Sequence, residues 1–432
     1  MNENINEKGD IGEKLVNKLA FDTYLKFWCY PGPKDEKGSK KEICDLLILF
    51  RDTAIILSVK NYAFKGNYER YFRSTLDKAV AQISGAERKL FDGGQVYINH
   101  IDLGEALFEP MKYSVIHRVI VNHSTSPLFY PGGRMTGNGK YVHVFNWEAF
   151  LGAVNELDTI PDFIAYLSER EVIFLDRDVT LMTGDQQDWT PEVRQSFIDY
   201  NSKREIVGNR CLLISGNELD LLADYYWNVR KFNKVFYLND YNGGGIDIDG
   251  KWNRYLEQKE VQNKKMADTD SYFIDEFVKH EVLYSTKPSN LELAVELLSL
   301  SRFERRILGS QLLGFAKQYK NASGLFTARR YGKVKDLLVT MVLYVDGMSH
   351  NGVMELIRIA AEGYVFMNNY RDRKVVVIGF SNKLDGFRFG LLKDIEPFGQ
   401  DYEQGLVSDL KMLNWFTDVE VFKVTHEEYP EN

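Results

Sequence analysis

Four polar side chains near the N-terminus could carry out chemistry on a phosphodiester bond: those of Glu13, Asp45, Lys60 and Gln82. Asp45 lies near the start of one short apolar run, CDLLILF, and Lys60 ends the next, AIILSVK. A carboxylate beside an ammonium group suits phosphodiester hydrolysis, because the acid can hold a divalent cation while the ammonium stabilises charge that builds on the phosphate. The same two residues could also form an ordinary cross-strand ion pair.

The two apolar runs are separated by a few polar residues, which predicts an antiparallel β-hairpin. We expect a two-residue loop at Asp52-Thr53. This loop places Asp45 directly opposite Lys60, with Ser58 on the same face of the hairpin. A register shift of one residue would move these side chains to opposite faces.

Helical spacing of apolar residues predicts a helix on each side of the hairpin. The first covers about residues 11–27 and turns Glu13 towards the body of the protein. The second covers about residues 68–91 and carries Gln82 on the stripe opposite its apolar one. Helix, hairpin and helix together would bring the four candidate residues to one place.

These segments resemble the PD-(D/E)XK nuclease superfamily, in particular its NERD-like and Mrr-like restriction endonuclease branch. The resemblance covers roughly residues 9–125 and rests on GEKLVNKLA, EICDLLILF, IILSVKNY and KAVAQISGAERKL. It implies an α/β fold with a restriction-endonuclease-like core in the order α, β-hairpin, β, α, β. In that family a strand acid and the acid of an ExK triplet bind magnesium.

The resemblance assigns a role to each candidate residue. Asp45 matches the strand acid, Lys60 the lysine and Glu13 the helix glutamate that often assists. Gln82 matches a glutamine found on the following helix in several branches. Ser58 stands where an acid is expected, giving Ser-Val-Lys, and a serine hydroxyl is a weak, neutral ligand for a hard cation.

The implied activity is that of a magnesium-dependent endonuclease, with manganese as a possible substitute, in restriction or phage defence. The metal would be held by Glu13, Asp45 and the carbonyl group of Val59. Lys60 would stabilise the transition state and orient the attacking water, and Gln82 would hold a phosphate or the metal shell. The alternative is a non-catalytic, nuclease-like module that binds nucleic acid or a protein partner, and the serine in place of the second acid favours it.

We predict three parts in the chain: a nuclease-like domain over residues 1–205, a mixed connecting region over 206–288 and an α+β domain over 289–432. The last part is a candidate for binding nucleic acid or a partner. In it we expect strands at 337–345, 375–380 and 386–391 and a helix at 352–362.

The net charge of the chain is −8, so nucleic acid, DNA in preference to RNA, would have to be met by local cationic patches. Residues 301–335 hold nine lysines and arginines against the single acid Glu304. Aromatic residues interleave with these cations, which suits base stacking but equally suits a buried core beneath a solvated charged face. The candidate phosphate-binding residues are Lys78, Lys89, Arg302, Arg305, Arg306, Arg329, Arg330 and Lys333.

His117 and His123 are six residues apart on a predicted strand and therefore share a face. Two histidines with no carboxylate close by in the sequence are more often structural than metal ligands, and we interpret them so.

Length and composition indicate a folded protein: the chain has 432 residues, of which 44% are hydrophobic and 13% aromatic. Its three cysteines include no CxxC pair, which argues against a disulfide framework or a zinc ribbon. The N-terminus is polar, and the longest apolar runs are far shorter than the ~18 residues that span a membrane. We therefore expect a cytoplasmic protein without membrane contact, as a possible homodimer or with a defence-system partner.

Overall fold

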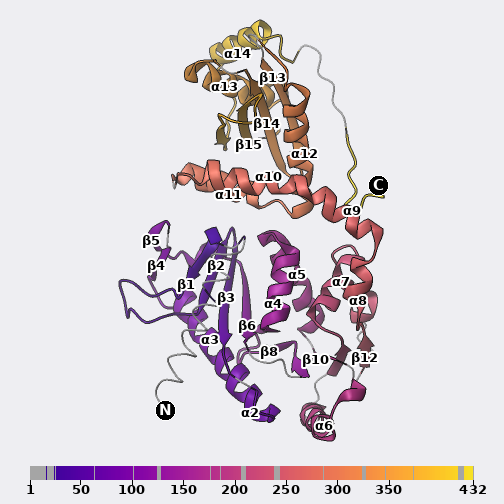
Figure 1. Ribbon diagram of the computed structural model, residues 1–432. Coiled ribbons are helices and arrows are strands. Elements are labelled where there is room, and N and C mark those ends of the chain that lie inside the picture. Colours follow the sequence, from indigo (N-terminus) through magenta and orange to yellow (C-terminus); the bar gives the residue numbers. More distant parts are fainter. Residues whose placement is uncertain are drawn as a thin grey trace. The chain divides into compact units, whose positions relative to one another are not determined.

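The computed structural model describes most of the chain, and it divides into two compact units, Met1–Gln258 and Lys259–Asn432 (Figure 1). The described residues are 16, 24, 26–62, 64–100, 102–123, 128–175, 177–184, 186–205, 211–237, 244–285, 287–323, 327–345, 347–372, 374–416 and 423–431.

The main sheet of the first unit has the strand order β1-β2-β3-β6-β9-β8. Neighbouring strands are antiparallel from β1 to β3 and parallel from β3 through β6 to β9, and β8 returns antiparallel to β9. Its strands are β1 (Cys29–Pro31), β2 (Leu46–Phe50), β3 (Thr53–Lys60), β6 (Val115–Asn122), β8 (Gly133–Met135) and β9 (Tyr141–Asn146).

A helical run crosses from β3 to β6, as a parallel connection requires. It consists of α2 (Tyr68–Phe72), the π-helical turn η2 (Arg73–Asp77) and α3 (Lys78–Phe91). The Thr75 hydroxyl in the π turn donates to the Tyr71 carbonyl at 2.8 Å. The predicted apolar stripe is confirmed, since these side chains are all buried: Phe72, Leu76, Ala79, Ile83, Ala86 and Leu90.

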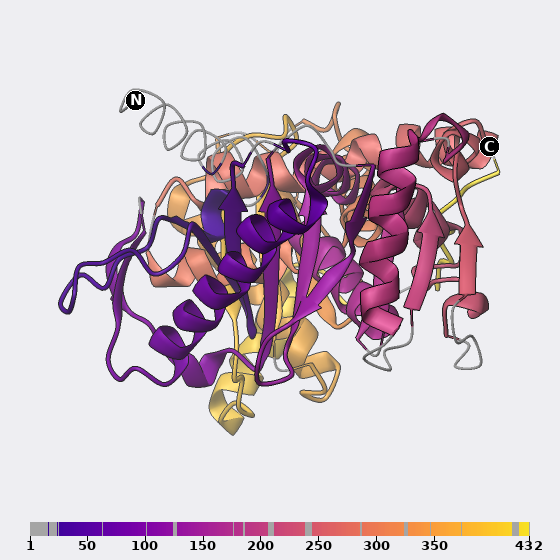
Figure 2. The ribbon, with the colours of Figure 1, turned by 90° about the horizontal axis from the view of Figure 1, so that it is seen from below.

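The two faces of this sheet are covered by different helices. On β6, Arg118 forms a bidentate ion pair with Glu87 of α3, with both N–O distances 2.6 Å. The adjacent residue His117 points to the other face, where it contacts Ser168 of α5 (Ile160–Phe174). Because successive side chains of a strand alternate, α3 and α5 lie on opposite faces. Figure 2 shows α3 lying across the strands.

The first unit contains a second sheet, with the order β12-β11-β10-β7, in which β10, β11 and β12 are parallel. Its segments from residue 211 onwards belong to this compact unit, which extends beyond the predicted boundary at residue 205. Periodicity within a segment does not show which sheet the segment joins. The elements are β7 (Phe129–Pro131), β10 (Asp178–Met182), α6 (Pro191–Glu205), β11 (Cys211–Ser215), α7 (Glu218–Trp227), β12 (Gly244–Asp247) and α8 (Lys251–Leu256).

Smaller elements complete the first unit. Between α3 and β6, β4 (Tyr97–His100) and β5 (Gly104–Leu107) form an antiparallel hairpin. After β9, α4 (Trp147–Leu157) begins at Asn146, whose side chain accepts a hydrogen bond from the Ala149 amide and so caps the helix.

The second unit has a sheet in the order β13-β14-β15-β16, with an antiparallel hairpin followed by a crossover helix and a parallel strand. The predicted strands and helix of this part are confirmed. Its elements are α9 (Lys259–Ala267), α10 (Tyr272–Phe277), α11 (Pro288–Leu298), α12 (Arg302–Gln318), β13 (Thr327–Val334), β14 (Leu337–Tyr344), α13 (His350–Met367), β15 (Val375–Ser381), β16 (Arg388–Leu392) and α14 (Gln400–Met412).

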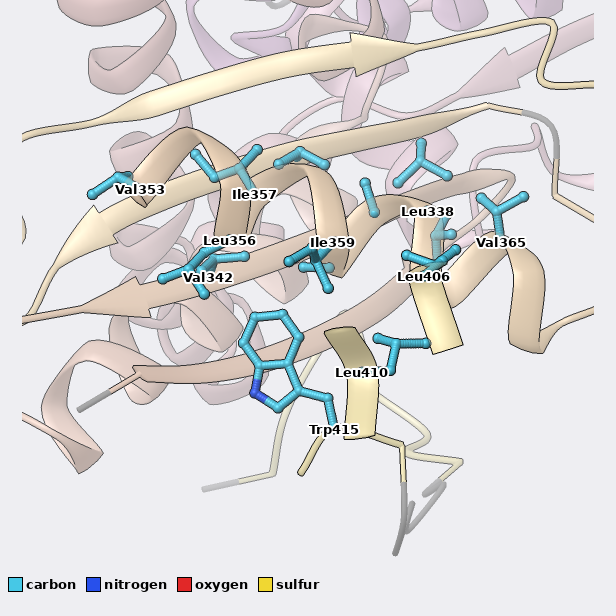
Figure 3. Close-up of a cluster of buried hydrophobic side chains, with 14 of the residues drawn as sticks. Leu338, Val342, Val353, Leu356, Ile357, Ile359, Val365, Leu406, Leu410 and Trp415 are labelled. Atoms are coloured by element: carbon cyan, nitrogen blue, oxygen red, sulfur yellow. The ribbon is translucent and has the colours of Figure 1, made fainter. Parts of the chain in front are cut away.

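The core of the second unit lies between the sheet and the pair α13 and α14. Leu338 and Val342 of β14 meet apolar side chains of α13, and Leu410 and Trp415 close the cluster from α14 and the residues after it (Figure 3). The protein is thus of mixed α/β class, as predicted at that level. Among the described residues, no helix combines the length and the apolar character needed to cross a membrane.

Candidate functional site

The hairpin register differs by two residues from the predicted one. Phe50 pairs with Thr53, so the loop is Arg51-Asp52 and not Asp52-Thr53. Thr53 is β-branched and buried in the strand, whereas Arg51 is exposed and has φ of 52°, a turn conformation. Asp45 consequently faces Ser58, and its predicted position opposite Lys60 is wrong. A shift of two residues preserves the side-chain alternation, so all three side chains still share one face.

The Asp45 carboxylate is held by the beginning of the Ser-Val-Lys triplet. Its Oδ2 atom accepts hydrogen bonds from the Ser58 hydroxyl at 2.9 Å and from the Val59 amide at 2.6 Å. Ser58 is buried, with 3% of its surface exposed. The serine therefore positions the strand acid. Val59 contributes its N–H here, and its carbonyl as a metal ligand stays a prediction.

Lys60 and Gln82 meet across the space between β3 and α3. The Lys60 ammonium donates a hydrogen bond to the Gln82 side-chain oxygen. Burial lowers the pKa of the half-buried Lys60, while the charges of Asp45 and Glu42 act in the opposite direction. The carboxylates of Asp45 and Glu42 therefore interact electrostatically with the Lys60 ammonium group.

Asp45, Ser58 and Gln82 line a cleft of about 370 Å³ between the start of β2, the end of β3 and the exposed side of α3. Glu42 lines this cleft and was not among the predicted site residues. It lies three positions before Asp45, and only the fold of the chain between β1 and β2 brings it to the cleft. The lining residues are Ser39, Lys41, Glu42, Ile43, Cys44, Asp45, Ser58, Gln82, Ile83, Gly85, Ala86 and Lys89.

The two cations predicted on α3 differ in their surroundings. Lys89 forms an ion pair with the buried Asp35 at 2.7 Å, so its ammonium stabilises the chain before β2. Lys78 is exposed and lies one helical turn before Gln82. Glu13, the predicted helix glutamate, lies outside the described residues.

Three of the predicted phosphate-binding residues, Arg302, Arg305 and Arg306, are buried in the second unit, with 6%, 1% and 7% of their surfaces exposed. Arg302 and Arg305 share the Asp275 carboxylate, at 2.7 and 2.5 Å. This environment does not fit the predicted role of Arg302 and Arg305 on phosphates, because both guanidinium groups are enclosed and paired with protein acceptors.

Arg306 is also largely buried, but it lines a cavity of about 490 Å³ in the second unit. It donates to the Glu427 carbonyl at 2.6 Å and lies 3.2 Å from an oxygen of Asp268. The high positive count of residues 301–335 therefore includes interior charges that are compensated by acids and carbonyls from distant parts of the chain. The sequence count alone does not distinguish these from surface charges.

The other predicted cations of the second unit lie on β13. Arg329 is half-buried over the Phe416 ring at 4.1 Å, and Arg330 donates to Gln318 at 2.8 Å. Lys333 forms an ion pair with Asp372 at 2.8 Å, with half of its side chain exposed. Their contact with phosphates stays a prediction.

Of the aromatic residues that were expected either to stack bases or to form core, Phe315 is buried with 1% of its surface exposed. Tyr331 packs against the hydrophobic core of the second unit and stacks on Phe416. For these two residues the core interpretation is confirmed. Phe326 lies outside the described residues.

The donors around the cleft are compatible with the magnesium ion that the family resemblance implies. Asp45 and Glu42 offer carboxylates, and the Ser58 hydroxyl, which donates to Asp45, keeps its lone pairs available. Mg²⁺ prefers oxygen ligands and commonly binds through one or two carboxylates while retaining several waters. The arrangement suits a weakly held ion with a largely aqueous shell.

A second group of possible ligands lies on the opposite face of the same sheet. His117 of β6, His143 of β9 and Glu171 of α5 each place one ligand atom within 4.8 Å of the others. Burial of the ring lowers the pKa of His143 well below its usual value, so the imidazole is neutral at neutral pH. The interpretation of His117 and His123 as structural, for want of a carboxylate close by in the sequence, missed His143 and Glu171, because these come from elements distant in the sequence.

Comparisons of the chain with protein-family models, curated proteins and solved structures found no match. Membership of the PD-(D/E)XK superfamily therefore stays a prediction that rests on the motifs of the chain itself.

Proposed function

We propose that the first unit is a metal-dependent nuclease that hydrolyses phosphodiester bonds of nucleic acid, DNA in preference to RNA. The observation that carries the proposal is the convergence of Asp45, Gln82 and Glu42 at one cleft, with the Lys60 ammonium bonded to Gln82 beside it. These residues come from three separate segments, and a carboxylate pair beside an ammonium group is the chemistry that phosphoryl transfer requires. A role in restriction or defence, and a homodimer or partner protein, rest on the family resemblance alone.

Within this proposal each side chain has a task. Asp45 and Glu42 would hold the divalent cation. Glu42 would serve as the second acidic ligand, because the chain has Ser58 at the position where the family has that acid. A bound Mg²⁺ supplies Lewis-acid polarisation of the phosphate oxygens. The Lys60 ammonium donates to a non-bridging phosphate oxygen and stabilises the charge that grows on it. Gln82 keeps the lysine side chain directed into the cleft, and its amide N–H groups can donate to the substrate.

The experiment is cleavage of supercoiled plasmid by the purified chain with Mg²⁺, with Mn²⁺ and with EDTA. We expect nicking or linearisation only with metal, and a loss of at least 100-fold in Asp45→Asn, which keeps the hydrogen-bond acceptor but removes the charge. Asp92→Asn, at an exposed position after α3, is the matched control and should cleave like wild type. Equal cleavage by wild type and Asp45→Asn would contradict the proposal.

A second candidate function is favoured by one observation: the buried Ser58 hydroxyl is bonded to Asp45 at the position of the second acid. A nuclease-like module that has lost its metal could use the same cleft to bind nucleic acid without cutting it. Binding of a labelled duplex, with no cleavage in either metal and no effect of EDTA on the affinity, would support this candidate and reject the first.

A further inference from the structure

The face of the main sheet opposite the cleft carries a compact group of three side chains. His117 lies on β6 and His143 on β9, where the register pairs His143 with Val119. Side chains at paired positions of neighbouring strands share a face, and so do residues two apart on one strand, so both imidazoles point the same way. Glu171 reaches them from α5, which packs on β9. The three residues thus come from three elements of the first unit.

The two histidines are buried, with 3% and 0% of their surfaces exposed. The ring nitrogens that face the group, Nδ1 of His117 and Nε2 of His143, have no hydrogen-bond partner. Buried polar atoms without partners are uncommon in folded proteins, because each costs its lost hydration. Two such atoms beside one carboxylate make this group a candidate ligand site.

The distances suit a metal ion. Oε2 of Glu171 lies 3.5 Å from Nδ1 of His117 and 3.8 Å from Nε2 of His143. With metal–ligand bonds of about 2.0–2.1 Å, as for zinc, ligand atoms of a tetrahedral site are ~3.4 Å apart. Small side-chain movements would therefore bring all three atoms into a first coordination sphere.

We propose that His117, His143 and Glu171 bind a transition metal ion of the zinc type. Two imidazoles and one carboxylate are a borderline-soft ligand set that suits Zn²⁺ better than Mg²⁺. Glu171 has 29% of its side chain exposed, so water can reach the fourth position. The site is distinct from the cleft at Asp45 and does not depend on the proposed nuclease activity.

The surroundings of His117 support the ligand role. Its Nε2 lies 3.3 Å from the Ser168 hydroxyl, which donates its own hydrogen to the Ile164 carbonyl. The serine oxygen therefore accepts the Nε2 proton, and Nδ1 is left with a lone pair directed at the group. Metal-bound histidines are commonly oriented by such a bond from the other ring nitrogen.

Metal binding must move the proton of the His143 ring from one nitrogen to the other. Its Nδ1 lies 3.3 Å from Nη1 of Arg170, which can only donate, so without metal the proton belongs on Nε2. Ligation through Nε2 moves this proton to Nδ1 and ends that contact. Arg170 keeps its shorter bond to the Gly132 carbonyl at 2.8 Å, and its charge stays compensated by the bidentate pair with Glu218.

The test is calorimetric titration of the full chain with ZnCl₂ after removal of metals with EDTA. We expect one Zn²⁺ per chain with a micromolar or lower Kd, and a rise of several degrees in Tm with Zn²⁺. Glu171→Gln removes the anionic ligand at a part-exposed position and should weaken binding at least tenfold. Glu148→Gln, at an exposed position on α4, is the matched control and should bind like wild type.

Two further measurements keep the outcome unambiguous. Circular dichroism must show that Glu171→Gln is folded, and Co²⁺ in place of Zn²⁺ should give the intense visible absorption of a tetrahedral site. Asp45→Asn should keep the tight Zn²⁺ site and lose at most a weaker binding of divalent cations in the cleft, so that zinc held in the cleft is recognised. No binding at 100-fold excess of Zn²⁺, equal binding by Glu171→Gln, or loss of binding in Asp45→Asn would overturn the proposal.

Discussion

At the scale of single residues, Ser58 is the position at which the candidate site differs from the pattern of the nuclease superfamily that the sequence resembles. Its hydroxyl donates to Asp45, and its neighbour Val59 donates to the same oxygen. The strand acid is therefore held in place even though the second carboxylate is missing from the strand. Glu42, from the chain before β2, is the acid that could compensate.

Replacing Ser58 by glutamate tests this arrangement. In Ser58→Glu a second carboxylate faces Asp45 in a buried position, so without metal we expect a loss of about 1–3 kcal/mol in the free energy of unfolding from charge repulsion and overpacking. With Mn²⁺ the two carboxylates share a cation, and the affinity measured by calorimetry should rise at least tenfold. The control is Ser84→Glu on α3. Unchanged Mn²⁺ affinity in Ser58→Glu would mean that Asp45 does not bind metal.

The pH dependence of cleavage should report Lys60. Because burial lowers the pKa of this lysine, the charged form is lost at a lower pH than for a free lysine. If the ammonium stabilises the transition state, the rate is highest below that pKa and falls about tenfold per pH unit above it. In Lys60→Arg, whose guanidinium keeps its charge, any remaining activity should lack the alkaline decline.

The control for the pH profile is Lys65→Arg, because Lys65 is exposed just after β3 and takes no part in the site. Its rate profile from neutral to alkaline pH should match that of wild type. An alkaline decline of the same position and steepness in Lys60→Arg would assign the titration to another group.

At the scale of elements, the arginines of α12 show how charge in a sequence can serve the interior. Arg305 is enclosed by Asp275 and by the carbonyls of Leu298 and Leu300, and it joins α12 to α10 and to the end of α11. The arginines at the start of residues 301–335 therefore include buried side chains that connect helices, although the sequence alone suggests a basic surface patch.

Removing this tie should destabilise the second unit. For Arg305→Met we expect a decrease of about 1–3 kcal/mol in the free energy of unfolding, because the carbonyls of Leu298 and Leu300 lose their donor and Asp275 keeps only Arg302 as a partner. Chemical denaturation measures the change. Arg330→Met, at a part-exposed position on β13, should cost less than about 1 kcal/mol. Equal stability of the two variants would contradict the interior role of Arg305.

At the scale of the whole molecule, a net charge of −8 opposes a polyanion, so any binding of nucleic acid depends on a few accessible cations and on salt. With three arginines of the second unit buried, the accessible candidates are fewer than the sequence count suggests. Lys78 is exposed on α3 one turn from Gln82, which lines the cleft.

Salt titrations should identify the patch that contacts phosphates. We expect Lys78→Ala to weaken duplex binding and to reduce the slope of log K against log salt by about one, as for one lost phosphate contact. Lys333→Ala removes a charge that is already paired with Asp372 and should leave the slope unchanged. The reverse result would transfer the nucleic-acid interface to the second unit.

The sequence by itself determined the local elements of both units. The hairpin, the apolar stripe of α3 and the strands β14 and β15 were predictable, because strand and helix periodicity are properties of short segments. The shared face of Asp45, Ser58 and Lys60 was predictable for the same reason, since a shift of two residues leaves the alternation unchanged.

What depends on contacts between distant segments was decided only by the tertiary structure. Asp45 pairs with Ser58 because the hairpin loop consists of Arg51 and Asp52 while Thr53 stays in the strand. Arg305 is buried because Asp275 and backbone carbonyls on other elements pair with its guanidinium group. The second sheet contains strands from beyond residue 205. His117, His143 and Glu171 come together from two strands and a helix. In each case the deciding interaction is the pairing or burial of groups far apart in the chain, which periodicity within a segment does not encode.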